Sequence, residues 1–361
     1  MNGCPRDIVA TLLGFIAQET CSSAEFETLA LRLFVWQHAS NQPYRRFCQR
    51  RGVTPRSVKS WRDIPAVPIS AFKEVALSCE PVGAAQRIFM TSGTTRGDVR
   101  GRHYHPTLAV YDSSMRSNFR RRFMRGEDRI RMAILFPTEE ELPNSSLAHY
   151  LALAFQEFGS DDSEYFLSSR GLETARLLQV LRDAEGTGQR LALLGASYSF
   201  VHLMDELRQR GETMRLPPGS RILDTGGYKG HSRQLPTEEF YTTLSDTFGV
   251  PADSCINMYG MTELSTQFYD DGNASAPSVK SGPHWIHSRM VDPLTGRDVA
   301  AGERGILAHC DLANFNSVTT ILTEDVAIAS EGGFLLLGRA EGSQAKGCSL
   351  AVAEFLRAVT P

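Results

Sequence analysis

The seven residues NMYGMTE at positions 257–263 begin inside a short apolar run at residues 255–258. The run predicts a buried strand, and the glycine that follows it predicts a turn out of the sheet. At a strand end the Tyr259 ring is suited to stack on a purine, and the Thr262 hydroxyl to reach a phosphate oxygen. The Glu263 carboxylate supplies a hard oxygen ligand for Mg²⁺. The alternative is a plain strand-to-helix turn with a cap and an exposed acid.

On both sides of this segment, short apolar runs alternate with helical patterns. Strands are predicted at residues 87–90, 131–136, 191–194, 222–223 and 255–258. Helices are predicted at residues 108–123, 147–158, 200–210 and 240–248, after a mainly helical first 80 residues. This alternation predicts an α/β fold with largely buried strands.

The sequence pattern changes from about residue 288. Short β-like pieces at residues 305–309, 318–322 and 333–337 are separated by glycines, and a last helix is predicted at residues 350–359. We therefore expect an α/β core over residues 1–287 and a small β-rich subdomain with a C-terminal helix over residues 288–361.

Composition excludes several classes of protein. The formal net charge is −3 over 361 residues, so no nucleic-acid partner is expected. No 18-residue apolar run occurs, which predicts a soluble protein without membrane insertion. The seven cysteines are scattered without a C-x-x-C pair, which favours a reducing, cytoplasmic location over a zinc site or a disulfide framework.

A loop rich in hydroxyl groups and glycine follows the strand at residues 87–90. It reads TSGTTRG at residues 91–97, and its backbone and hydroxyl donors suit a triphosphate. It is not a Walker A loop, because the G-K-[ST] ending is missing. A simple flexible loop is the alternative. The phosphate-binding candidates are Thr91, Ser92, Gly93, Thr94, Thr95 and Gly97.

Three shorter motifs complete the set. The sequence DTGG at residues 224–227 ends a strand, and Gly226 and Gly227 permit a flat ligand to approach the backbone. In LTED at residues 322–325 a carboxylate is placed to hold ribose hydroxyls. In GRAEG at residues 338–342, Arg339 is suited to ribose or phosphate.

The order of these motifs resembles the adenylate-forming superfamily of acyl-CoA synthetases, adenylation domains and luciferases, over roughly residues 60–350. The resemblance implies the fold of that superfamily and the use of ATP and Mg²⁺. It implies that Tyr259 contacts adenine, that Glu263 holds Mg²⁺ and that Asp325 binds ribose. It also makes Arg339 the arginine at the domain hinge.

The chain departs from the superfamily pattern in two places. Arg96 stands in the phosphate loop where a lysine-containing sequence is usual, and Arg96, Arg100 or Arg102 is expected to replace that charge. The sequence stops at Pro361, so we expect the mobile C-terminal domain with its catalytic lysine to be lacking. A shortened chain of this kind resembles the acyl-protein synthetases of the LuxE type.

That family activates a fatty acid and loads it onto its own cysteine near the C-terminus, a position matched here by Cys348. The residues around Cys348 support the same assignment, because Cys348 follows Lys346 and precedes the predicted last helix. A cation and a helix N-terminus both lower the pKa of a thiol and make it a better nucleophile. A buried structural cysteine is the alternative.

We therefore expect ATP-dependent conversion of a carboxylic acid, in the first place a fatty acid, to an acyl-adenylate. The acyl group then passes to Cys348 and onward to an acyl-accepting reductase or carrier. Two alternatives remain: adenylation of an aromatic or secondary-metabolite acid with transfer to a separate thiol or amine, and a non-catalytic nucleotide-binding subunit. The pairs His103 with His105 and His284 with His287 are expected to be ordinary hydrogen-bonded histidines.

Overall fold

The computed structural model describes residues 5–92, 99–228 and 232–359. Contacts group the chain into two compact units. Unit 1 comprises Met1–Ser117, Met261–Thr266 and Ser281–Pro361, and unit 2 comprises Asn118–Gly260 and Gln267–Lys280. The N-terminal helices therefore pack with the C-terminal β-rich part, a grouping that differs from the linear division at residues 287 and 288. That division stays a prediction.

Unit 1 begins with three helices, α1 (Pro5–Ile16), α2 (Ser23–Ser40) and α3 (Gln42–Arg50). A capping box starts α2, because the Ser22 and Glu25 side chains each accept a hydrogen bond from the other's backbone amide. Apolar residues at helical spacing, from Phe26 to Phe34, form the buried face of α2. This face ends on a polar residue, Gln37, which is completely buried.

The main sheet of unit 1 contains long antiparallel strands in the order β16-β15-β14-β13. Their bounds are β13 (Ile286–Val291), β14 (Arg304–Asp311), β15 (Thr320–Ser330) and β16 (Gly333–Arg339). The short strand β1 (Val67–Pro68) pairs in parallel with β15. The last helix, α10 (Gly342–Val359), contacts α3, β1 and α4 (Ala71–Glu74).

Residues 312–319, which join β14 to β15 without regular structure, are buried throughout; we call them the buried segment. Buried irregular backbone is unusual, because its polar groups need partners other than water. Gln37 meets this need: its Nε2 donates to the carbonyl oxygens of Asn314 and Phe315, and its Oε1 accepts from the Thr319 amide. Nδ2 of Asn41, the residue that caps the start of α3, donates to the Ser317 carbonyl oxygen. The polar end of α2 therefore fixes the buried segment.

Further short elements of unit 1 follow α3 in the chain, before α5 (Ala109–Phe119). The antiparallel strands β2 and β3 pair in the register Met90 with Arg102, so they frame the loop at residues 91–101. The elements are η1 (Trp61–Asp63), η2 (Val82–Ala84), β2 (Arg87–Met90), β3 (Arg102–His105) and α5 (Ala109–Phe119).

Unit 2 is built on a sheet of six strands in the order β11-β10-β9-β8-β4-β5. All neighbours are parallel except β11, which runs antiparallel to β10. The strands are β4 (Arg131–Leu135), β5 (Glu164–Tyr165), β8 (Leu191–Gly195), β9 (Arg221–Asp224), β10 (Cys255–Tyr259) and β11 (Phe268–Tyr269). The short elements are η3 (Arg120–Met124), β6 (Leu167–Ser168), β7 (Gly171–Leu172), η4 (Ala252–Ser254) and β12 (Val279–Lys280).

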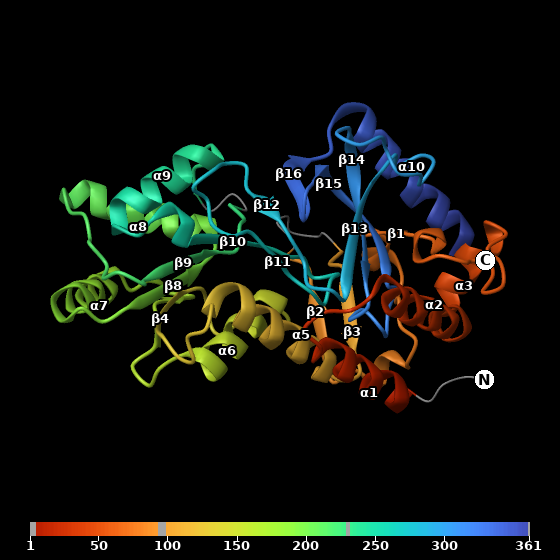
Figure 1. The fold of residues 1–361 in the computed structure, drawn as a ribbon, viewed down its shortest axis with the longest axis horizontal. Helices are drawn as coiled ribbons and strands as arrows, with labels where there is room; N and C mark the ends of the chain where they lie inside the picture. Colours follow the sequence, from red (N-terminus) through yellow and green to blue (C-terminus); the bar gives the residue numbers. More distant parts are fainter. Residues whose placement is uncertain (1–4, 93–98, 229–231, 360–361) are drawn as a thin grey trace. The chain divides into compact units, whose positions relative to one another are not determined.

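The helices that connect these strands cover the sheet, and α8 and α9 lie side by side (Figure 1). One apolar core joins β4, β8, β9 and β10 to α7, α8 and α9 through residues such as Leu193, Phe200 and Leu244. The helices are α6 (Ser146–Phe158), α7 (Thr174–Thr187), α8 (Ser197–Arg210) and α9 (Thr237–Phe248). The carboxyl ends of β8, β9 and β10 lie next to one another, the edge at which parallel sheets bind ligands.

The α/β fold predicted from sequence is confirmed, and every strand predicted in the core lies within a residue or two of its expected position. The last helix ends at Val359 as predicted, but it begins at Gly342 and not near residue 350. Helical residues in the glycine-rich stretch before Leu350 lack the apolar periodicity on which the prediction depended. None of the helices in the described ranges is long and apolar enough to cross a membrane.

Replacing Gln37 with leucine tests the dependence of unit 1 on the buried segment. Gln37→Leu leaves two carbonyl oxygens and one amide buried without their partner, at about 1–3 kcal/mol for each unsatisfied group. We expect a loss of roughly 2–5 kcal/mol in the free energy of unfolding, measured by urea titration. Gln49→Leu on the exposed face of α3 is the matched control and changes it by less than about 0.5 kcal/mol. Equal stability of the two variants contradicts this account.

Candidate active site

The candidate site in unit 1 centres on Glu263, which lies in the turn at Met261–Thr266 and is only 6% exposed. Two hydrogen bonds close the base of the loop at residues 91–101. The Thr91 amide donates to the Gly101 carbonyl oxygen (3.0 Å), and the Gly101 amide donates to the Thr91 hydroxyl (2.9 Å). The Glu263 carboxylate faces this closure, since a Cβ atom placed on Gly101 would lie 3.4 Å from Oε1 of Glu263.

Gly101 has no side chain, which lets its backbone lie close to Thr91 and Glu263. A Cβ atom there would lie 3.1 Å from Cγ2 of Thr91, tighter than ordinary van der Waals contact. Burial raises the pKa of Glu263 to about 7, while Lys73 and Arg339 act weakly in the opposite direction. A buried carboxylate that is costly to ionise would be stabilised by a cation, which offsets the cost of burying the charge.

The backbone of the turn is held by His103 on β3. Its Nδ1 lies 3.0 Å from the carbonyl oxygen of Thr262, and its Nε2 lies 3.1 Å from the hydroxyl of Ser317 in the buried segment. Burial lowers the pKa of His103 to about 4, so the ring is neutral. A carbonyl oxygen only accepts, so Nδ1 carries the proton and Nε2 accepts from Ser317. The histidine thus joins the turn to the buried segment, which confirms that it is an ordinary hydrogen-bonded residue.

Two further polar residues complete the support of the turn. Nδ2 of Asn314 donates to the Glu263 carbonyl oxygen (2.8 Å). The buried carboxylate of Asp311 accepts from the Ser265 amide (3.0 Å) and the Thr266 hydroxyl (2.8 Å). Burial raises the pKa of Asp311 to about 6 despite these donors. Backbone and side-chain bonds therefore fix the turn on both sides of Glu263.

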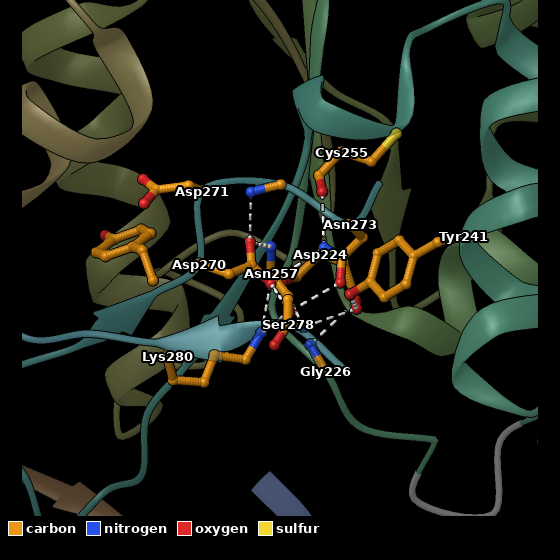
Figure 2. Close-up of polar contacts among 12 residues, drawn as sticks. Asp224, Gly226, Tyr241, Cys255, Asn257, Asp270, Asp271, Asn273, Ser278 and Lys280 are labelled. Carbon is orange, nitrogen blue, oxygen red and sulfur yellow. Dashed lines mark hydrogen bonds and ion pairs between the residues drawn. The ribbon is translucent and has the colours of Figure 1, made fainter. Parts of the chain in front are cut away.

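The candidate site in unit 2 is the glycine turn after β9. Gly226 and Gly227 both adopt positive φ, at 70° and 88°, which a side chain would oppose. Figure 2 shows how the carboxylate of Asp224 supports this turn. Its Oδ1 accepts from the Gly226 amide (3.0 Å) and the Ser197 hydroxyl (2.8 Å), and its Oδ2 accepts from the Tyr241 hydroxyl (2.9 Å).

The turn is also tied to α8 and to β10. The amides of Ser197 and Tyr198, at the start of α8, donate to the carbonyl oxygens of Gly226 and Gly227. Nδ2 of Asn257 donates to Oδ2 of Asp224 at 2.9 Å (Figure 2). Since Asn257 lies on β10 opposite Asp224, this bond sets the turn beside the strand end that carries Tyr259.

A buried ion pair supports the same strand from its other side. Nζ of Lys280 lies 2.5 Å from Oδ2 of Asp270, and the other carboxylate oxygen accepts from the Asn257 amide (Figure 2). Burial lowers the pKa of Lys280, while Asp270 acts against that shift. Removing one partner would leave a buried charge uncompensated.

Asp325 and Arg339 lie on neighbouring strands of unit 1 and are paired in register. Nη1 of Arg339 lies 3.6 Å from Oδ1 of Asp325, and Nη2 lies 2.5 Å from Oε2 of Glu324. One guanidinium group therefore contacts two successive carboxylates of β15. The two residues that the sequence placed near ribose are in contact, and Glu324 joins them.

Cys348 does not lie where the sequence placed it. It is inside α10, not before the first turn of a helix, and its side chain is buried in an apolar cluster with Val291, Leu322 and Ala351. Burial raises the pKa of its thiol, Glu324 raises it further and Arg339 acts in the opposite direction. The expected lowering of the thiol pKa is therefore wrong in this conformation, because desolvation outweighs the nearby cation.

The structure separates the sequence-predicted residues by unit. Four of the phosphate-loop candidates, Gly93, Thr94, Thr95 and Gly97, lie outside the described residues. Unit 1 holds Thr91, Ser92, Thr262, Glu263, Asp325, Arg339 and Cys348, and unit 2 holds Gly226, Gly227 and Tyr259. No group of three or more metal-binding side chains occurs among the described residues, so Glu263 is a single carboxylate ligand candidate.

Sequence reasoning missed the residues that support the site. His103, Asp311 and Asn314 lie far from Glu263 in the chain, and no local pattern marks them. Asp224 had a local signal, because an aspartate two residues before a glycine is typical of an Asx turn, yet only the glycines were assigned a role.

Comparisons with known proteins agree on one family. The model of the family described as acyl-protein synthetase, LuxE, matches residues 15–357. A long-chain-fatty-acid–luciferin-component ligase of Vibrio harveyi is 23% identical over 82% of this chain and 77% of its own length. The ligase of the same name from Aliivibrio fischeri is 23% identical over 92% of this chain and 88% of its own length.

Solved structures share the fold at low sequence identity. A 2-hydroxyisobutyryl-CoA ligase in the postadenylation state, in complex with an acyl-AMP, superposes with a TM-score of 0.64 and 16% identity over 89% of this chain and 69% of its own. ATP-bound MatB from Rhodopseudomonas palustris superposes with a TM-score of 0.52 and 16% identity, over 72% of this chain and 49% of its own. The chain belongs to the LuxE family of acyl-protein synthetases and has the fold of the adenylate-forming enzymes.

Proposed function

We propose that this chain activates a long-chain fatty acid with ATP, releases pyrophosphate, and transfers the acyl group from the adenylate to Cys348. Membership of the acyl-protein synthetase family supports a ligase activity. The relatives' names, long-chain-fatty-acid–luciferin-component ligase, support a fatty acid as substrate and a second protein as final acceptor. An acyl-accepting reductase or carrier is the partner that this chemistry requires.

The observation that carries the proposal is the buried Glu263 carboxylate facing Thr91 and Gly101 at the base of the loop. Two anions, a carboxylate and a triphosphate, must meet for the first step, so charge neutralisation dominates its cost. Glu263 would hold Mg²⁺, which supplies Lewis-acid neutralisation of the phosphate charge. The Thr91 and Ser92 hydroxyls and the Thr262 hydroxyl are the donors assigned to phosphate oxygens.

The remaining assignments follow the geometry of each unit. In unit 2 the open glycine turn at Gly226 and Gly227 is suited to the flat face of adenine, with Tyr259 as the stacking ring. In unit 1 the Asp325 carboxylate is assigned to the ribose hydroxyls and Arg339 to ribose or phosphate. Asp224 and His103 act as positioning residues, because each holds the backbone of a turn assigned to binding.

A second candidate function differs in the acceptor and in the acid. Cys348 is buried with a raised pKa, which favours a mechanism in which the adenylate passes to a thiol or amine of another molecule. In this second candidate function, aromatic or secondary-metabolite acids are the substrates. Acyl labelling of the chain separates it from the acyl-protein mechanism.

Substitution of Glu263 tests the activation step. With Mg²⁺ and a panel of fatty and aromatic acids, the wild-type chain should exchange labelled pyrophosphate into ATP, and most strongly with long-chain fatty acids. Glu263→Gln should lower the exchange rate by about a hundredfold or more, as expected for the loss of one preorganised electrostatic element. Glu185→Gln, on the exposed surface of α7, should retain the wild-type rate. Wild-type exchange in Glu263→Gln would remove Glu263 from the metal site.

The same variant should be more stable than the wild type at alkaline pH. The folded-state pKa of Glu263 is about 7, above its ordinary value of 4.5, so ionisation opposes folding as pH rises from 4.5 through 7. Glu263→Gln removes this cost, and we expect a gain of about 1–3 kcal/mol at pH 8 that fades below pH 5. Thermal unfolding at both pH values measures it. A gain of equal size at pH 5 and pH 8 would exclude ionisation as its cause.

Substitution of Cys348 tests the transfer step. Adenylation needs no thiol, whereas transfer needs a thiolate, so Cys348→Ser should keep pyrophosphate exchange and lose the thioester label. The label is measured with radiolabelled fatty acid and released by neutral hydroxylamine. Cys21→Ser, which is half-buried and in another part of unit 1, is the control and should label normally. Persistent labelling of Cys348→Ser, or none in the wild type, would favour the second candidate function.

A further inference from the structure

A pocket of about 350 Å³ opens beside Cys348 in unit 1. Its walls are mainly small or apolar, from Ala340 on one side and Ala345 and Val352 on α10. Polar groups enter it from Glu324, Arg339 and Ser70. It therefore combines a thiol with a carboxylate, a cation and hydroxyl groups, since Ser349 also lines it.

The thiol needs a proton acceptor in this pocket. Cys348 is 6% exposed, and its buried environment disfavours the thiolate. Lys346, the cation nearest to it in sequence, is exposed and is not among the pocket-lining residues. A neutral thiol is a poor nucleophile, so attack on an acyl carbonyl requires that the proton leave as the bond forms.

Glu324 is a carboxylate that lines the same pocket as Cys348. Among the described residues that line the pocket, it alone carries an acidic side chain. Glu324 and Cys348 also interact electrostatically. Its backbone is fixed because its carbonyl oxygen accepts from the Ala340 amide (2.8 Å), and its side chain is fixed by the ion pair with Arg339. The charged groups around Glu324 are Arg339 on β16, its neighbour Asp325 and, more weakly, Glu263; α10 adds no charged side chain to the pocket lining.

A second observation indicates that the pocket is prepared for a polar ligand. The hydroxyl of Ser70, on the pocket wall, is buried and has no hydrogen-bond partner among the described residues. A buried donor without a partner costs free energy unless a ligand satisfies it. A carbonyl oxygen of a bound acyl group would meet that need.

We propose that Glu324 is the general base that takes the Cys348 proton during acyl transfer, an inference that rests on the proposed function. The thiol proton moves to the Glu324 carboxylate while Sγ forms a bond to the carbonyl carbon of the acyl-adenylate. The bond from that carbon to the phosphate oxygen breaks, and AMP leaves with the electron pair. The proton on Glu324 then passes to water. The products are the thioester, AMP and one proton.

The test compares Glu324→Gln with Glu331→Gln, an exposed glutamate in the β15–β16 turn. Single-turnover labelling of Cys348 by radiolabelled fatty acid and ATP measures transfer, and pyrophosphate exchange measures adenylation. Glu324→Gln should slow labelling by about a hundredfold or more, as for loss of a general base, with exchange within about twofold of wild type. Its residual labelling rate should rise about tenfold per pH unit between pH 7 and 9, because hydroxide replaces the missing base. Glu324→Asp should restore part of the rate, and Glu331→Gln should match the wild type.

The possible failures are distinguishable. Normal labelling in Glu324→Gln overturns the assignment of Glu324 and leaves the proposed function intact. An equal loss of exchange and labelling also overturns it, since Glu324 would then act at the nucleotide. A wild-type chain that exchanges pyrophosphate but never labels Cys348 overturns the acyl transfer itself.

Discussion

The structure of unit 1 depends on satisfying the backbone of the buried segment at residues 312–319. Eight consecutive residues without regular structure are withdrawn from water, so each of their polar groups needs a protein partner. Gln37 and Asn41 supply those partners from one side. On the other side the segment acts as a donor, because Asn314 binds the Glu263 carbonyl oxygen and Ser317 binds His103. The packing of two N-terminal helices and the conformation of the candidate site are thus consequences of one set of hydrogen bonds.

This arrangement explains how an ionisable group can be buried beside the loop. A carboxylate in a dry setting usually draws in water or shifts the backbone to relieve its cost. Here the turn is held at Thr262, at Glu263 and at Ser265 by three side chains of β3, β14 and the buried segment. The Glu263 carboxylate stays aimed at Thr91 and Gly101 because its backbone has no freedom to turn away. Burial of the carboxylate costs stability at that position, while these hydrogen bonds fix the backbone that carries it.

Sequence alone predicted the α/β class, the core strands and the motif residues, because these depend on local patterns. Apolar runs followed by Gly226, Gly227 or Gly260 mark strand ends whatever the tertiary structure is. The supporting residues depend on contacts between distant segments. Asp311 reaches Ser265 across 46 positions and Gln37 reaches Thr319 across 282, and an isolated buried aspartate or glutamine has no sequence signature. Cys348 was assigned the wrong environment for a related reason: its pKa is set by burial against β13 and β15, which its neighbours in sequence do not reveal.

Two adjacent residues of β15 link the adenylation step and the transfer step of the proposed reaction. Glu324 lines the Cys348 pocket, and Asp325 follows it directly on β15. Arg339 contacts both carboxylates from the neighbouring strand. In the proposed reaction Asp325 belongs to the nucleotide and Glu324 to the thiol, so one guanidinium group lies between the adenylate and its acceptor. A negative phosphate that draws Arg339 toward the nucleotide would weaken its ion pair with Glu324 and leave that carboxylate free to accept the thiol proton. Formation of the adenylate would then itself activate Cys348.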